Sequence, residues 1–163
     1  MIKFDPFDYE NSFYEYDLNI TDDEVNQIFV LVKNSKALDC KTTFQELNVL
    51  NFPTLKNLKK QITDILDKYN LFLSNNWAQF YNKGDSHGVH IHERSVLSGI
   101  VYLRGNNCTP TSFFSKQFIE YVHEFKPNKL LLFPSMTPHE VKTLKKDEER
   151  LVISFNATKH GNE

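Results

Sequence analysis

The chain has 163 residues, a formal net charge of −2 and a hydrophobic fraction of 40%. This length is typical of a single domain, and so small a charge gives no sign of a nucleic-acid-binding surface. No apolar run is long enough to span a bilayer, and the first residues lack the apolar stretch of a signal peptide. Cys40 and Cys108 are too few for a disulfide framework. We therefore expect one cytoplasmic domain over residues 1–163, with reduced thiols, that binds neither nucleic acid nor a membrane.

Two helices are predicted in the first half of the chain. Thr21 and Glu24 have the spacing of a capping box, and apolar residues at helical spacing follow them, which predicts a helix over about 21–35. A second helix is predicted over about 54–70, because its apolar residues fall on one face. The aromatic and acidic segment 13–18 is a candidate edge strand, and such an exposed edge would allow a homodimer.

From residue 71 the hydrophobic period changes from 3.6 to 2, which indicates strands. Turn-forming residues separate many of them. The predicted strands cover residues 71–82, 87–93, 95–104, 111–115, 118–125, 129–134, 138–144 and 150–158. About eight short strands after two helices predict a mainly β fold. It would be a jelly roll of the cupin-like, double-stranded β-helix type, with the helices packed on its outside.

Three histidines have the pattern of a metal site. His90 and His92 are two apart on a predicted strand, so both imidazoles point to the same side. His139 would add a third from a distant strand. Three ligands on one face leave the opposite positions open for substrate and dioxygen, as in non-haem iron oxygenases. The alternatives are a solvent-exposed His-x-His pair, a structural histidine at 139, and Glu93 as ligand in place of His92.

One face of the last predicted strand carries Arg150, Ser154 and Asn156, which predicts the wall of a polar cavity. An arginine in apolar surroundings is costly unless an anion meets it, and a carboxylate bound bidentately suits it best. The hydroxyl groups of Tyr81 and Tyr102, on two other predicted strands, could orient such a carboxylate or keto acid. The alternatives are a surface ion pair of the arginine with the acidic residues that precede it, and two core tyrosines.

Other polar residues are given weaker interpretations. Asp85 and His87 lie in a glycine-flanked loop and are expected to be solvated, while His123 and His160 are assigned no role. The loops expected to set specificity are 36–52, 83–89 and 104–128, with 105–110 as a candidate lid.

These residues, in this order, resemble the 2-oxoglutarate- and Fe(II)-dependent oxygenase superfamily. The resemblance is strongest to the small oxygenases of marine phages and bacteria that are related in plan to prolyl 4-hydroxylases. It covers roughly residues 72–157 and is carried by the segments 76–84, 90–103, 132–141 and 149–156. It implies a double-stranded β-helix that binds Fe(II) and 2-oxoglutarate, with a metal-binding core over about 72–158.

The resemblance also implies a ligand set. His90 would match the first histidine of the superfamily triad and His139 the last, while His92 stands where the superfamily usually has Asp or Glu. Three-histidine iron sites occur in cysteine-dioxygenase-like cupins. Imidazole also suits Zn, Ni and Cu, so the metal itself is left open.

For the cosubstrate, the resemblance implies that Arg150 pairs with the distal carboxylate of 2-oxoglutarate and that Tyr102 hydrogen-bonds it. Tyr81 would lie near the cosubstrate at the pocket mouth. Ser154 and Asn156 lie on the matching strand face.

The implied activity is a dioxygenase that hydroxylates an unidentified substrate, with formation of succinate and CO2 from 2-oxoglutarate and O2. The substrate would be a prolyl or other protein side chain, or a small molecule. Two alternatives stay open: a three-histidine cupin-type dioxygenase that does not use 2-oxoglutarate, and a non-catalytic metal-binding module with a vestigial or zinc-filled site. If the chain is phage-encoded, its compartment would be the host cytoplasm.

Overall fold

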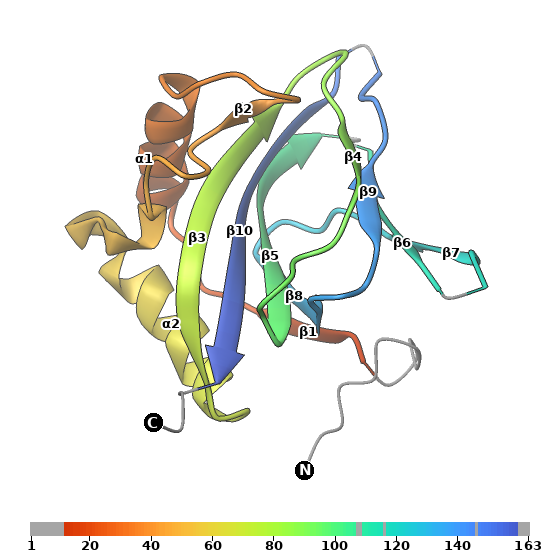
Figure 1. Ribbon diagram of the computed structural model, residues 1–163. Helices are drawn as coiled ribbons and strands as arrows, with labels where there is room; N and C mark the ends of the chain where they lie inside the picture. The colour runs from red at the N-terminus through yellow and green to blue at the C-terminus, as the bar shows by residue number, and fades with distance from the viewer. Residues whose placement is uncertain (1–11, 107–108, 116, 146, 160–163) are drawn as a thin grey trace.

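The computed structural model describes residues 12–106, 109–115, 117–145 and 147–159 (Figure 1). Cys108, His160 and part of the predicted lid at 105–110 lie outside these residues. The described elements form two antiparallel sheets that face each other, with two α-helices on the outside of the larger one. This confirms the mainly β fold with flanking helices that the change of hydrophobic period predicts.

The larger sheet has six strands. In spatial order these are β1 (Tyr14–Asp17), β8 (Lys129–Pro134), β5 (Leu97–Asn106), β10 (Glu149–Lys159), β3 (Leu71–Tyr81) and β2 (Lys41–Thr42). The smaller sheet contains β4 (His87–His90), β9 (His139–Val141), β6 (Thr111–Phe114) and β7 (Glu120–His123). From β3 onward the chain alternates between the two sheets, apart from the β6–β7 hairpin within the smaller one, which is the jelly-roll connectivity. The candidate edge strand is β1, which pairs with β8 on one side only, whereas the homodimer stays a prediction.

Helix α1 (Asp22–Lys33) starts at the predicted capping box. The Glu24 N–H donates to Thr21 Oγ1 over 3.2 Å, and the Thr21 N–H donates to Glu24 Oε2 over 2.9 Å. The other oxygen of Glu24 accepts from the Leu58 N–H, so this carboxylate joins α1 to the start of α2 (Lys56–Asp67). Two short 3₁₀ turns, at Val49–Asn51 and Pro53–Leu55, precede α2. The second helix therefore begins later than predicted, because the segment after the proline forms the tighter turn.

Apolar side chains fill two layers. The first lies between the helices and the outer face of the six-stranded sheet, where Ile28, Leu58, Ile62 and Val101 are fully buried. Figure 1 shows α1 and α2 beside β3, on the side away from the smaller sheet. The second layer lies between the sheets and mixes apolar with polar groups. The scaffold is therefore held mainly by the helix–sheet layer, which leaves the space between the sheets for a site.

The strands of the smaller sheet are shorter than predicted. β4 ends at His90 rather than at 93, and its pairing with β9 is irregular between His87 and His90. β7 and β9 have four and three residues. One side of this sheet faces solvent, so these strands lack the buried neighbours that would extend them.

Gly99 lies in close contact with Phe155 inside the larger sheet. A Cβ built on it would lie 2.1 Å from Cζ of Phe155, whose ring covers the glycine from β10. The sheet therefore needs glycine here for lack of space rather than for backbone freedom. No helix in the described part of the chain is long and apolar enough to cross a membrane.

Candidate active site

A cavity lies between the two sheets and, counted together with the space that opens to solvent at its mouth, has a volume of about 390 Å³. Its lining brings together the predicted histidines of β4, the following bend and β9 with the predicted arginine of β10. Apolar side chains from the larger sheet complete the wall: Ile100, Phe133 and Val152. The elements that sequence patterns singled out separately thus meet in one cavity.

His90, His92 and His139 form a cluster in which one nitrogen of each ring lies within 4.8 Å of the others. Nε2 of His92 and Nε2 of His139 are 3.2 Å apart. Metal–imidazole bonds are about 2.1 Å long, which places two ligand nitrogens at right angles about 3 Å apart. The observed separation is therefore that of two ligands on one face of a metal ion.

Backbone carbonyls fix the tautomers of two of these rings. Nδ1 of His90 lies 2.8 Å from the Gly88 carbonyl oxygen, and Nδ1 of His139 lies 2.9 Å from the Thr137 carbonyl oxygen. Because a carbonyl only accepts, each Nδ1 carries the proton and each Nε2 keeps its lone pair. Metal-binding histidines are oriented in this way by their outer hydrogen bonds.

The electrostatics of the cluster favour neutral imidazoles. Burial, with a further contribution from His90, lowers the pKa of His92 to about 4. Burial and the same neighbour hold the pKa of His139 well below its usual range. Metal ligation requires the neutral ring, so the cluster is in its binding form at neutral pH.

His92 reaches the cluster from the bend after β4 and not by strand alternation, which corrects the reasoning from the sequence. Its N–H donates to the Ser135 carbonyl oxygen over 2.9 Å, and its ring stacks on Trp77 with centroids 5.7 Å apart. Glu93 is exposed and lies outside the cluster.

Arg150 is 1% exposed, and within the described residues its charge has no carboxylate partner. Nη2 donates to Thr111 Oγ1 over 2.8 Å and Nη1 donates to the Thr109 carbonyl oxygen over 3.3 Å, while Nε has no partner. Glu148 binds Thr109 and the Lys145 N–H instead, and no carboxylate in the described ranges forms an ion pair with the arginine. A buried guanidinium with this pattern of contacts is chemically suited to an anionic ligand.

Two tyrosine rings flank the guanidinium. Cζ of Arg150 lies 5.6 Å from the ring centroids of both Tyr81 and Tyr102, within cation–π range. The Tyr102 hydroxyl is 3.2 Å from Thr111 Oγ1, so it lies beside the group that binds the arginine. Burial raises the pKa of Tyr81 well above its usual range, and its hydroxyl therefore stays protonated.

Sequence reasoning missed two polar residues of the wall. Nε2 of Gln79 donates to the Tyr81 hydroxyl over 2.9 Å and lies 3.2 Å from Nδ1 of His87, and Ser154 Oγ donates to Gln79 Oε1 over 2.8 Å. His87, expected to be solvated, is half-buried and stacks on His90 with centroids 3.9 Å apart. Strand alternation with Tyr81 could have found the glutamine, whereas nothing local places the histidine.

A wide groove, with about 1050 Å³ of space open to solvent, adjoins the cluster. Phe44, Trp77 and Ile91 form apolar parts of its lining, and Asp39 and Glu93 add two carboxylates. Three imidazole rings line both this groove and the cavity: His87, His90 and His92. A molecule in the groove would therefore contact the histidines directly.

No protein-family model matches this sequence, and no curated protein is similar to it. Solved structures are similar in fold. An oxidoreductase of the 2OG-Fe(II) oxygenase family from Burkholderia pseudomallei aligns with a TM-score of 0.66 at 13% identity, covering 93% of this chain and 86% of that one. A prolyl hydroxylase from Trichoplax adhaerens, in complex with a hypoxia inducible factor peptide, has a TM-score of 0.65 at 15% identity and coverages of 91% and 84%.

The third similar structure is SnoN, a non-heme alpha-ketoglutarate-dependent epimerase from nogalamycin biosynthesis. Its TM-score is 0.69 at 11% identity, and the alignment covers 93% of this chain and 78% of SnoN. At identities this low, the structural similarity establishes the architecture alone. The reaction has to be argued from the site. The chain therefore has the double-stranded β-helix fold that 2-oxoglutarate- and Fe(II)-dependent oxygenases share.

Proposed function

We propose that this protein is a 2-oxoglutarate- and Fe(II)-dependent dioxygenase. One observation carries the proposal: a single cavity joins three converging neutral imidazoles to a buried, unneutralised arginine. The first group suits a divalent metal and the second suits a carboxylate. A metal-chelating keto acid with a second carboxylate would satisfy both, and 2-oxoglutarate is such a molecule.

His90, His92 and His139 would hold the iron through their Nε2 atoms. The hydrogen bonds to Gly88 and Thr137 orient two of these rings without any metal, so the ligand set is preorganised. When bound, Fe(II) supplies the chemistry of dioxygen activation, which no side chain can perform. A third imidazole in place of a carboxylate leaves one more positive charge at the site, which favours an anionic cosubstrate beside it.

Arg150 and Tyr102 would bind the distal carboxylate of the cosubstrate, and Tyr81 would cover the guanidinium from its other side. Ile100, Phe133 and Val152 would exclude water from the carbon chain between the two ends. Exclusion of water strengthens the arginine–carboxylate interaction, because the local dielectric constant is low.

The open groove beside the cluster supports a substrate that enters from solvent. Because the groove is open to solvent, it can admit a side chain carried by a larger molecule, and we propose a prolyl or other protein side chain as the hydroxylated group. Phe44 and Trp77, whose rings pack edge to face at 4.9 Å, would form the apolar contact surface. Because the two carboxylates among the lining residues disfavour acidic sequences, basic and proline-containing peptides are the first to screen.

The test is an anaerobic titration of the protein with Fe(II) and then with 2-oxoglutarate, followed by visible absorbance. Chelation by the keto acid gives a weak metal-to-ligand charge-transfer band. We expect the band in wild type, its loss in His139→Ala and its weakening in Arg150→Met. Absence of the band at saturating iron would refute the proposal, and tight zinc retention in the same sample would then identify a non-catalytic metal-binding module.

A further inference from the structure

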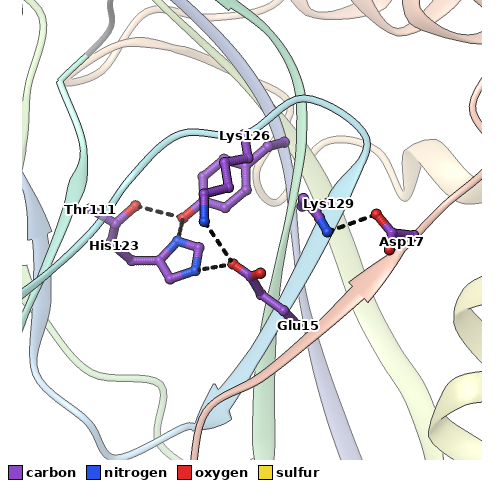
Figure 2. Close-up of polar contacts among 7 residues, drawn as sticks. Glu15, Asp17, Thr111, His123, Lys126 and Lys129 are labelled. Atoms are coloured by element: carbon purple, nitrogen blue, oxygen red, sulfur yellow. Dashed lines mark hydrogen bonds and ion pairs between the residues drawn. The ribbon is translucent and has the colours of Figure 1, made fainter.

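His123 extends the polar contacts of the cavity to the protein surface. Figure 2 shows its imidazole from β7 beside the Glu15 carboxylate of β1. Nε2 of His123 is 2.8 Å from Glu15 Oε2, and Nδ1 is 3.1 Å from the Tyr102 hydroxyl. The imidazole also stacks on the Tyr102 ring, with an angle of 7° between the planes. These contacts hold the ring so that each nitrogen faces one partner.

When His123 is neutral, it accepts a hydrogen bond from the Tyr102 hydroxyl. Nε2 must carry the ring proton, because the Glu15 carboxylate accepts and cannot donate. Nδ1 is then an acceptor, and the Tyr102 O–H donates to it. In this arrangement the tyrosine has no proton left for a carboxylate beside Arg150.

A second proton on the imidazole reverses this bond. Nδ1–H of His123 then donates to the Tyr102 oxygen and Nε2–H still donates to Glu15, so the tyrosine O–H no longer donates to His123. It can then donate to Thr111 Oγ1, 3.2 Å away, or to an anion held by Arg150, which binds the same threonine. Protonation of His123 therefore converts Tyr102 from a donor within the protein to a donor for a ligand.

We propose that His123 and Glu15 are positioning residues for the cosubstrate, and that binding of its distal carboxylate takes up one proton on His123. The inference rests on the proposed function, since it requires a dicarboxylate keto acid at Arg150. It assigns a role to a histidine that does not line the cavity, through the Tyr102 hydroxyl, which lies 3.2 Å from Thr111 Oγ1 in the cavity wall.

The charges around His123 also favour its protonation when a carboxylate binds at Arg150. The titratable and charged groups that face it are Glu15 from β1, Tyr102 from β5, Lys126 after β7 and Arg150 from β10. Burial lowers the pKa of His123, Glu15 opposes this, and Lys126 and Arg150 lower it further. A carboxylate bound to Arg150 would neutralise the arginine and raise the pKa of His123.

The sign of the pH dependence follows by linkage. The complex binds more protons than the free protein, so affinity falls as pH rises through the pKa that His123 has in the complex. One proton gives a limiting slope of about tenfold in Kd per pH unit. Both carboxyl groups of 2-oxoglutarate are ionised in this range and add no slope of their own.

The experiment is calorimetric titration of the anaerobic Fe(II)-loaded protein with 2-oxoglutarate, in buffers of different ionisation enthalpy. It is run from about pH 6 to pH 8, where an ordinary histidine titrates. The dependence of heat on buffer counts the protons taken up. 2-Oxovalerate, a keto acid that lacks the distal carboxylate, serves as the control ligand, because it would chelate the metal without reaching Arg150.

We expect wild type to take up a proton with 2-oxoglutarate and none with 2-oxovalerate. His123→Gln should bind with no proton uptake and no pH slope, and Glu15→Gln should shift the slope to lower pH. Asp17→Asn is the matched control, because this carboxylate of the same strand pairs with Lys129 at 2.7 Å, and it should behave as wild type.

Four outcomes would overturn the inference. Proton uptake that persists in His123→Gln would place the proton elsewhere, and equal uptake with 2-oxovalerate would place it at the metal. Wild-type binding of 2-oxoglutarate without proton uptake would refute the inference while leaving the proposed function intact. Absence of binding at every pH would refute the proposed function, and the inference with it.

Discussion

Replacement of Arg150 by methionine should change affinity and stability very differently. Methionine keeps most of the side-chain length between the two tyrosine rings but removes the charge. Truncating one partner of a buried charge pair costs about 2–5 kcal/mol of binding free energy. We therefore expect the dissociation constant of 2-oxoglutarate to rise by about 30-fold to 5000-fold.

The free energy of unfolding should change little. The substitution removes two hydrogen bonds to a charged group, worth about 1.5–3 kcal/mol each, and two cation–π contacts of about 0.5–2 kcal/mol each. It also removes the desolvation penalty of a guanidinium that is 1% exposed and lacks an ion pair, a penalty of several kcal/mol. These contributions oppose each other, so the net change should lie within about 2 kcal/mol of zero.

Two measurements check this pair of expectations: calorimetric binding of 2-oxoglutarate to the metal-loaded protein, and urea unfolding of the metal-free protein. Arg104→Met is the matched control. Arg104 lies on β5 opposite Leu151, and its guanidinium covers the Phe29 ring at 4.2 Å, on the helix side of the sheet. Its substitution should leave cosubstrate affinity unchanged.

The reasoning would be refuted if Arg150→Met bound 2-oxoglutarate within about threefold of wild type, since a neutral side chain would then do as well. It would also be refuted by a loss of more than about 4 kcal/mol in unfolding free energy. That result would show that the protein already compensates the buried charge and that the arginine has a structural role.

Three further predictions follow from the packing and the chemistry of the site. Gly99→Ala should lower the free energy of unfolding by about 1–3 kcal/mol, because the added methyl group overlaps the Phe155 ring. Phe155→Leu should restore part of this loss in the double variant, and urea unfolding measures both. Fe(II) or Zn(II) at about a hundred times its Kd should stabilise wild type by about 2.7 kcal/mol, and a similar gain in His139→Ala would exclude the cluster as the binding site. Burial raises the pKa of the Cys40 thiol to about 12, so in a Cys108→Ser background the folded protein should react far more slowly with a thiol reagent at pH 8 than the urea-unfolded protein does; equal rates would contradict its burial.

Local patterns predicted the features that depend on neighbours in sequence. The capping box at Thr21 places the start of α1 correctly, because both of its hydrogen bonds lie within four residues. The alternation along β10 placed Arg150 and Ser154 on one face, and the structure has both in the cavity lining. A long, buried strand carries this signal clearly, because its two faces meet different surroundings.

Features that depend on distant contacts could not be predicted. The end of β4 at His90 reflects irregular pairing with β9, which no residue of β4 encodes. His123 acquires its partners only because β1 brings Glu15 beside it, across 108 positions of sequence. The position of His87 likewise depends on Gln79 of another strand. The sequence thus predicted the metal-ligand histidines and the buried arginine. It did not predict the side chains that hold them or their neighbours in place.

In the proposed complex, the backbone of β10 would set the length of keto acid that fits the cavity. This strand carries Arg150 into the cavity and, farther along, Asn156, which lines the adjoining groove together with His92. Strands rise about 3.3 Å per residue, and pairing with β3 and β5 on both sides prevents β10 from sliding. The strand would therefore fix the distance between a carboxylate at Arg150 and a metal at the histidine cluster. Single substitutions should change how tightly a keto acid binds, whereas a preference for one carbon more or fewer would require a new register of the sheet.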